Sequence, residues 1–169
     1  MELERYILGE TAETLAIETL EECAAVSLAL VEQAKRTLHV FSRDLDARLY
    51  DTAPFLEAVR QLAIRGRFTD IRILVQSTDH AIKSGHRLIE LARHLNSYIH
   101  MRAVHPEFRD YNQAFLVADE NGFLQRGLAD RFEGKASFYD PLEARELVRF
   151  FTKVWEISGR DPGLQRLHI

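Results

Sequence analysis

Hydrophobic and polar residues first alternate and then recur at helical spacing in the N-terminal part of the chain. Alternation around residues 13–19 predicts a short strand, and a longer helix from Thr11 is the competing interpretation. Residues 21–35 place apolar side chains three and four positions apart, as in a helix with one buried face. The predicted stripe consists of Ala24, Leu28, Val31 and Ala34. A compact apolar run at 37–41 then predicts a strand, followed by the polar segment 42–46.

The next helix has clear boundary signals. Asp51 or Thr52 can cap it, and Pro54 fits its first turn because no N–H is needed there. Gly66 suits its end. Its predicted buried face consists of Phe55, Leu56, Val59, Leu62 and Ala63. Residues 70–75 follow as an apolar run and predict a buried strand.

A third helix and a further strand follow. The helix ends near Asn96, and its apolar stripe consists of Leu88, Leu91, Ala92 and Leu95. Its start stays open, since three residues can cap it: Thr78, Asp79 and Ser84. Residues 98–104 alternate between apolar and polar, which predicts a strand that Pro106 ends.

The segment 111–127 has the pattern of a β-hairpin. Two apolar runs flank a polar turn that ends in Asn121-Gly122, a pair that accepts positive φ at low cost. Residues 135–139 predict another short strand. The sequence 140–143 is a strong helix start, with an Asp cap, a proline in the first position and a glutamate in the third.

This last helix is expected to end at Gly159, before an irregular tail at 160–169. Its apolar stripe consists of Leu147, Val148, Phe151, Val154 and Trp155. Strands that alternate with helices up to the hairpin predict an α/β layered sandwich, with a mixed, mostly parallel sheet flanked by helices. We expect one domain over residues 1–169, with its core at about 13–158.

Composition adds few constraints on function. The 169 residues are 46% hydrophobic and 28% charged, which are globular values. A formal net charge of −4 gives no overall attraction to nucleic acid or anionic membranes. The sequence shows no secretory signal and no apolar run of membrane-spanning length, so we expect a cytoplasmic protein without membrane insertion. Cys23 lies in an apolar helical run and is expected to be a buried thiol.

His86, Glu90 and His94 follow one another at spacings of four, which would place them on one face of the third helix. Imidazole and carboxylate groups can bind zinc. This face lies opposite the leucine stripe, so we interpret it as a solvated surface. The sequence predicts neither a metal site nor a cofactor.

Polar residues at the end of the strand at 37–41 are the first candidates for a site. Ser42, Arg43 and Asp44 stand where ligands of open α/β sheets gather, although Asp44 and Asp46 can also form a simple turn. A second group is cationic and consists of Arg102, His105, Arg109, Arg126, Arg131 and Lys135. These residues either line one anion-binding cleft or are scattered surface charges balanced by nearby acids.

The order of elements over about residues 15–158 resembles one half of the phospholipase D superfamily. The cues are the polar segment after the strand at 37–41, Gly66, the sequence Arg72-Ile73-Leu74, and the later helix, strand and hairpin. In that family the hairpin carries His-x-Lys-x4-Asp, and a Gly-Ser/Thr-x-Asn stretch follows. The His attacks a phosphodiester to form a phosphohistidine, and the Lys binds phosphate oxygens. Two motif copies meet across a twofold axis, within one chain or in a homodimer.

This chain departs from the motif at the residues that carry the chemistry. Aligned on the hairpin, Asn112 takes the His position, Ala114 the Lys position and Asp119 the Asp position. Residues 127–130 read Gly-Leu-Ala-Asp in place of the second stretch. Asparagine cannot form the covalent intermediate, and alanine offers no charge to a phosphate. The whole chain also looks like a proteobacterial domain family, sometimes fused to GNAT-type acetyltransferases, which implies no activity here.

The resemblance therefore implies a bacterial pseudoenzyme: a catalytically degenerate phospholipase D-like domain acting as a binding or regulatory module. Its expected partners are a phosphate-containing ligand or a protein, and the family suggests a homodimer. The candidate ligand-binding residues are Ser42, Arg43, Asp44, Arg102, Asn112, Asp119 and Arg126. One alternative is a phosphodiester hydrolase or transferase with a rearranged site, using Asp44, Asp119 and a histidine such as His100 or His105. Nucleic-acid binding near Arg102 and Arg126 is the weaker alternative, since the chain is acidic overall.

Overall fold

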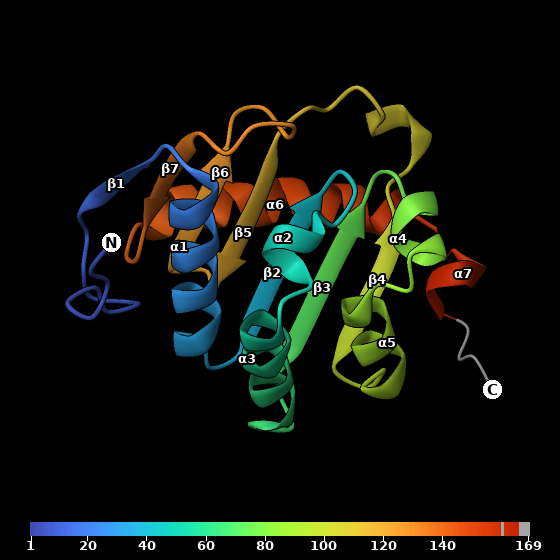
Figure 1. The fold of residues 1–169 in the computed structure, drawn as a ribbon, viewed down its shortest axis with the longest axis horizontal. Helices are drawn as coiled ribbons and strands as arrows, with labels where there is room; N and C mark the ends of the chain where they lie inside the picture. The colour runs from blue at the N-terminus through green and yellow to red at the C-terminus, as the bar shows by residue number, and fades with distance from the viewer. Residues whose placement is uncertain (160, 166–169) are drawn as a thin grey trace.

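One seven-stranded sheet organises the protein, seen in a computed structural model that describes residues 1–159 and 161–165. The strands are β1 (Thr14–Ile17), β2 (Thr37–Ser42), β3 (Asp70–Val75), β4 (Ile99–Ala103), β5 (Ala114–Ala118), β6 (Gly122–Arg126) and β7 (Gly134–Ser137). Their order in the sheet is β1-β7-β6-β5-β2-β3-β4 (Figure 1). Only β2, β3 and β4 pair in parallel, and the other neighbours are antiparallel. The expected α/β sandwich with a mixed sheet is confirmed, with a smaller parallel part than predicted.

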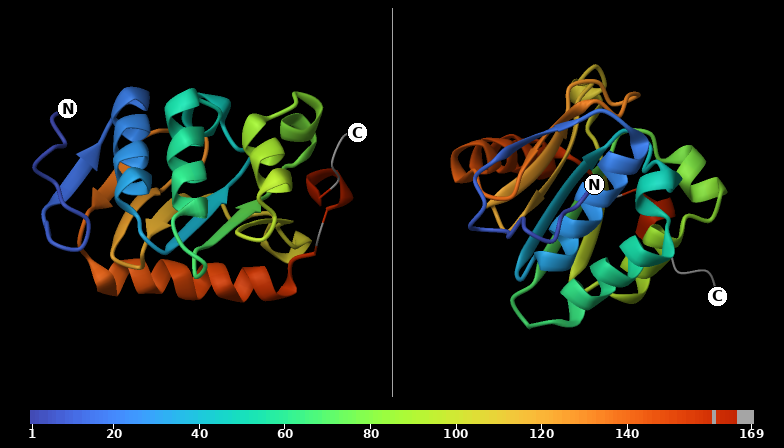
Figure 2. Two further views of the ribbon diagram at one scale, coloured as in Figure 1. Left: turned by 90° about the horizontal axis from the view of Figure 1, so that it is seen from below. Right: turned by 60° about the vertical axis from the view of Figure 1, so that its left-hand side comes forward.

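Helices cover both faces of this sheet. One face carries α1 (Leu20–Gln33), α2 (Ala47–Tyr50), α3 (Ala53–Ile64), α4 (Asp79–Lys83) and α5 (Arg87–His94). The other face carries α6 (Pro141–Ile157), which runs across the strands (Figure 2). The short helix η1 (Pro106–Phe108) lies in the connection between β4 and β5, and α7 (Pro162–Gln165) follows α6. None of the helices in the described part of the chain is long and apolar enough to cross a lipid bilayer.

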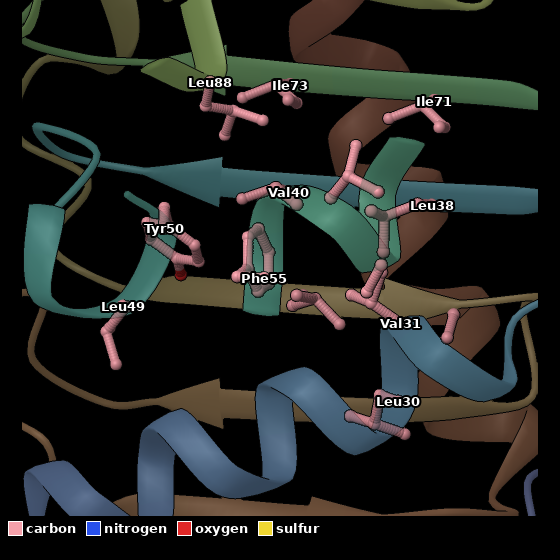
Figure 3. Packing of buried hydrophobic residues seen from close by; sticks show 14 of the residues in the cluster. Leu30, Val31, Leu38, Val40, Leu49, Tyr50, Phe55, Ile71, Ile73 and Leu88 are labelled. Atoms are coloured by element: carbon pink, nitrogen blue, oxygen red, sulfur yellow. The ribbon is translucent and has the colours of Figure 1, made fainter. Parts of the chain in front are cut away.

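Two apolar layers form the core, one on each face of the sheet. On the side of α1 and α3, Val40 of β2 faces Phe55 and Tyr50, and Ile73 of β3 lies beside Leu88 of α5 (Figure 3). The layer under α6 is rich in aromatic rings and includes Phe41, Phe115, Phe123, Phe151 and Trp155. Burying one such ring stabilises the fold by about 1.5–3 kcal/mol, so both layers contribute to the stability of the sheet.

Most predicted boundaries follow from side-chain caps, and two predictions at the N-terminal side need comment. Thr19 and Glu22 form a capping box that starts α1, so β1 is a strand and the alternative helix from Thr11 is wrong. The buried face of α1 agrees with the predicted stripe only at Val31 and at the C-cap residue Ala34. It consists of Cys23, Val26, Ser27, Leu30 and Val31, while Ala24 and Leu28 are partly exposed. Both rows have helical spacing, and only the position of the sheet selects between them.

The predicted third helix is two helices. Gly85 has a φ of +70°, which ends α4, and His86 then caps α5. His86 is therefore buried and shares no exposed face with Glu90 and His94, so the predicted solvated row of three is wrong. The sequence signal for this break was Gly85 itself, a glycine in the middle of the helical pattern.

The hairpin is confirmed, but its turn lies earlier than Asn121-Gly122. Asp119 and Glu120 have positive φ, +55° and +53°, and form the turn. Gly122 already belongs to β6, where a Cβ would lie 2.6 Å from a Leu8 methyl and 3.0 Å from the Ser137 carbonyl. The glycine is thus needed for close packing and not for the turn. In the predicted irregular tail, residues 162–165 form α7, and residues 160 and 166–169 lie outside the described part of the chain.

Candidate functional site

The carboxyl end of β2 and the residues next to β5 and β6 meet at one end of the sheet, called here the motif end. Phe41 pairs with Phe115, and Ala114 pairs with Arg126. The residues just beyond these pairs therefore lie side by side. The motif end comprises Ser42, Arg43, Asp44, Asn112 and Arg126, which are five of the seven candidate residues.

The connection between β4 and β5, residues 104–113, passes over this end of the sheet (Figure 1). The crossing is required because β4 is an edge strand while β5 pairs with the far side of β2. Gln76, just after β3, donates from Nε2 to the carbonyls of Phe108 and Tyr111 at 3.2 and 2.6 Å. The ring of Tyr111 stacks on Phe150 of α6 with centroids 4.4 Å apart. These contacts fix the backbone that presents Asn112.

Asn112 is tied to both sides of the motif end. Its side-chain oxygen accepts a hydrogen bond from the Arg43 guanidinium. Its carbonyl accepts the N–H of Ala129 at 2.7 Å, which holds the loop after β6. Ala114, two residues on, is fully buried. Asn112 and Ala114, which the sequence analysis compared with the catalytic motif, thus belong to the packed structure.

Arg126 points into the protein. Only 3% of its surface is exposed, and its Nη1 donates to the carbonyls of Ala129 and Arg131 at 3.1 and 2.9 Å. Its guanidinium also lies 5.7 Å from the centre of the Phe132 ring. Arg126 therefore closes the loop 127–133 over the sheet.

Two potentially reactive groups lie near Arg126, and both are buried. Burial raises the pKa of the Tyr50 hydroxyl to about 12, against the opposing effect of the guanidinium. Cys23 is buried, as expected, and this burial raises the pKa of its thiol. Neither group is set up as a nucleophile near neutral pH.

The segment after β2 is held by side chains that sequence reasoning did not assign. The Ser42 hydroxyl accepts the N–H of Leu45 at 3.0 Å, and Leu45 adopts a φ of +56°, which is strained for a branched side chain. His86 contacts the Leu45 carbonyl through Nε2 at 2.9 Å, while its Nδ1 accepts the N–H of Leu88. This pair of contacts puts the proton on Nε2, and burial lowers the pKa of His86. Asp46 caps α2, as the simple-turn interpretation expects, and Asp44 is exposed.

Asp119 lies at the opposite end of the sheet. Its carboxylate accepts three backbone N–H groups where α1 leads into β2, from Lys35, Arg36 and Thr37 at 2.8, 2.8 and 3.0 Å. The length of β5 separates it from Asn112, about 20 Å at the usual rise of a strand. The structure therefore does not bring Asp119 together with Asp44, as the rearranged hydrolase site would require.

Arg102 lies at the same end of the sheet as Ser42 but on the edge strand β4, two strands away from β2. Its guanidinium sits 4.3 Å from the centre of the Trp155 ring, and its Nη1 donates to the Trp155 carbonyl at 2.8 Å. It lines a cavity at the open edge of the sheet. Within the described residues, no group of three His, Cys, Asp or Glu side chains is placed to hold a metal ion.

The fold is similar to that of phospholipase D-like proteins. Nuc from Salmonella typhimurium, a phospholipase D family member, superposes with a TM-score of 0.62 at 14% identity over 88% of this chain and 100% of Nuc. NucT from Helicobacter pylori gives 0.60 at 10% identity over 88% of this chain and 98% of NucT. TrmBL2, an archaeal chromatin protein with a novel mode of DNA binding, gives 0.65 at 14% identity over 94% of this chain. This chain spans 57% of TrmBL2.

These likenesses define the class as a phospholipase D-like α/β fold. At the level of sequence, residues 19–167 match the family described as "Domain of unknown function (DUF7931)". The chain belongs to that family. No match was found among curated protein sequences.

Proposed function

We propose that the protein is a catalytically degenerate phospholipase D-like domain that binds a protein partner, in the first place a second copy of itself, at the motif end. The observation that carries the proposal is the hydrogen-bonded network of Arg43, Asn112 and Arg126. This network includes Asn112, the residue that the sequence alignment puts at the histidine position of the phospholipase D motif.

The aligned positions lack the two groups that phospholipase D-like proteins use for catalysis, the nucleophile and the phosphate-binding cation. Asn112 has no nucleophilic ring nitrogen, and Ala114 has no charge for a phosphoryl oxygen. Asp119, which could act in acid–base chemistry, binds three backbone N–H groups about 20 Å away. The side chains at the motif end are therefore held in hydrogen bonds within the protein and offer no nucleophile.

The shape and charge of the motif end suit a protein better than a small ligand. Three cavities among the described residues lie at the β4 edge, on α6 and between α3 and α5, and no residue of the motif end lines any of them. At the motif end the surface instead carries a partly exposed Arg43, an exposed Asp44, and Leu128 with 44% of its surface exposed. Adjacent charges of opposite sign suit a twofold interface, because Arg43 of one copy can face Asp44 of the other.

Nucleic-acid binding has no such support in this chain. The likeness to TrmBL2 concerns the fold, and Arg126 is bonded to two carbonyls inside the protein. A phosphate backbone could reach Arg126 only if the loop 127–133 opened.

The experiment is sedimentation velocity over a wide range of concentrations. We expect a dimer for the native chain and a monomer for Leu128→Asp, because a buried carboxylate at an apolar contact opposes association. The matched control is Leu142→Asp on α6, where 78% of the leucine is exposed and no effect is expected. A native chain that stays monomeric at all concentrations, or a dimer that Leu128→Asp leaves intact, contradicts the proposed interface.

A further inference from the structure

A cavity of about 390 Å³ opens at the outer edge of the sheet, beside β4 and two strands away from β2. It lies between the edge strand β4, helix α5, helix α7 and the last turns of α6, which are neighbours in Figure 1. Four basic residues line it: Arg72, Arg93, His100 and Arg102. No acidic side chain occurs among its described lining residues. In a protein with a net charge of −4, this is a local concentration of cationic groups.

Arg93 is the informative member. Its side chain is only 3% exposed, a rare state for arginine. Its Nη1 donates to Glu90 at 2.8 Å, and its Nη2 donates to the Gly163 carbonyl. Its buried Nε–H finds no hydrogen-bond partner among the described residues. A buried donor without a partner destabilises the fold until an acceptor atom pairs with it.

Two further guanidinium groups flank the single tryptophan of the sequence. Arg72 lies 5.3 Å and Arg102 4.3 Å from the centre of the Trp155 ring. Asp70 accepts the Nε–H of Arg72 at 3.0 Å, which uses one edge of that guanidinium. The Arg72 side chain keeps 35% of its surface exposed, so it is within reach of a solute. His100 is exposed on β4.

We propose that this cavity is a binding site for the phosphate group of a small molecule. Planar guanidinium groups bind phosphate in a forked, bidentate manner, and three of them line this cavity: Arg72 and Arg102 beside Trp155, and Arg93 on α5. A volume of about 390 Å³ falls within the range of small-ligand sites. Ile99, Met101 and Leu164 form an apolar wall that can receive the uncharged part of the molecule. The site is independent of the proposed interface at the motif end, since it shares none of its residues.

Trp155 provides a direct test because its ring lies against the guanidinium groups. The full chain is titrated with inorganic phosphate and with adenosine monophosphate, and its intrinsic fluorescence is recorded. Isothermal titration calorimetry supplies a second readout that does not depend on the fluorophore. Citrate tests carboxylate chemistry, and sodium chloride at equal ionic strength tests simple screening. We expect a saturable response to the phosphate compounds that citrate and sodium chloride do not reproduce.

The variants locate the response. Arg72→Gln is expected to weaken binding at least tenfold, and Arg93→Lys, which lacks the Nε–H, to weaken it as well; thermal melting confirms that both remain folded. Arg145→Gln, an exposed arginine on the outer face of α6, is the matched control and should bind like the native chain. No saturable response, an equal response to citrate or salt, or full affinity in Arg72→Gln overturns the proposal.

Discussion

Replacing Asp119 removes the acceptor of three backbone N–H groups at the start of β2. The three contacts, from Lys35, Arg36 and Thr37, measure 2.8, 2.8 and 3.0 Å. A hydrogen bond to a charged group contributes about 1.5–3 kcal/mol. The site is partly exposed, so water replaces part of the loss, and we expect Asp119→Gly to lower the free energy of unfolding by about 2–4 kcal/mol.

The choice of replacement separates hydrogen bonding from backbone strain. Asp119 has a φ of +55°, which glycine and asparagine tolerate but alanine does not. Asp119→Asn keeps one carbonyl oxygen without its charge and should cost about half as much as Asp119→Gly. Asp119→Ala adds about 1 kcal/mol of strain to the loss of the acceptor.

Urea unfolding followed by circular dichroism measures these differences. The matched control is Glu120→Gln, which removes the same charge one residue away, in the same turn and also at positive φ. Glu120 makes no ion pair or side-chain hydrogen bond among the described residues, so its midpoint should not move. If Asp119→Gly and Asp119→Asn unfold at the same urea concentration as Glu120→Gln, the assignment of Asp119 as a structural acceptor is refuted.

Two further predictions concern buried groups. Burial lowers the pKa of His39 from 6.5 to about 4, so the folded state resists protonation. Its contribution to stability is complete above pH 6.5 and is lost as the pH falls toward 4, by about 3 kcal/mol in all. His39→Phe should flatten the pH dependence of unfolding in that window, and an unchanged slope would refute this. Arg126→Met should lower the free energy of unfolding by about 2–4 kcal/mol because two carbonyls lose their charged donor; chemical denaturation checks this, and native-like stability would contradict the role given to Arg126.

The parts of the fold that sequence could predict are those with local physical signals. Thr52 and Asp140 cap α3 and α6 as expected, because their side chains bond N–H groups three residues away. Gly85 is such a signal for the boundary between α4 and α5. The helical spacing of the leucines that follow it favoured a single helix instead. No local signal identified the buried face of α1, because two rows of apolar residues on this helix both have helical spacing.

The candidate site could be predicted only in part for the same reason. The structure places Ser42, Arg43 and Asn112 at one end of the sheet, because β2 and β5 are neighbouring strands; their role in binding stays a prediction. The hydrogen bonds of Asp119 join residues more than 80 positions apart, which no local pattern encodes. The edge cavity is likewise built by Arg72, Arg93 and Trp155 from three separate elements, and their proximity exists only in the folded chain.

Hydrolysis of bis-p-nitrophenyl phosphate tests the central claim, that a fixed network has replaced the catalytic motif. Native chain, Asn112→Ala and Asp44→Asn are assayed side by side at high enzyme concentration, with and without divalent cations. The account predicts release of nitrophenol at the rate of the buffer blank for all three. Steady turnover by the native chain that either substitution abolishes would contradict it.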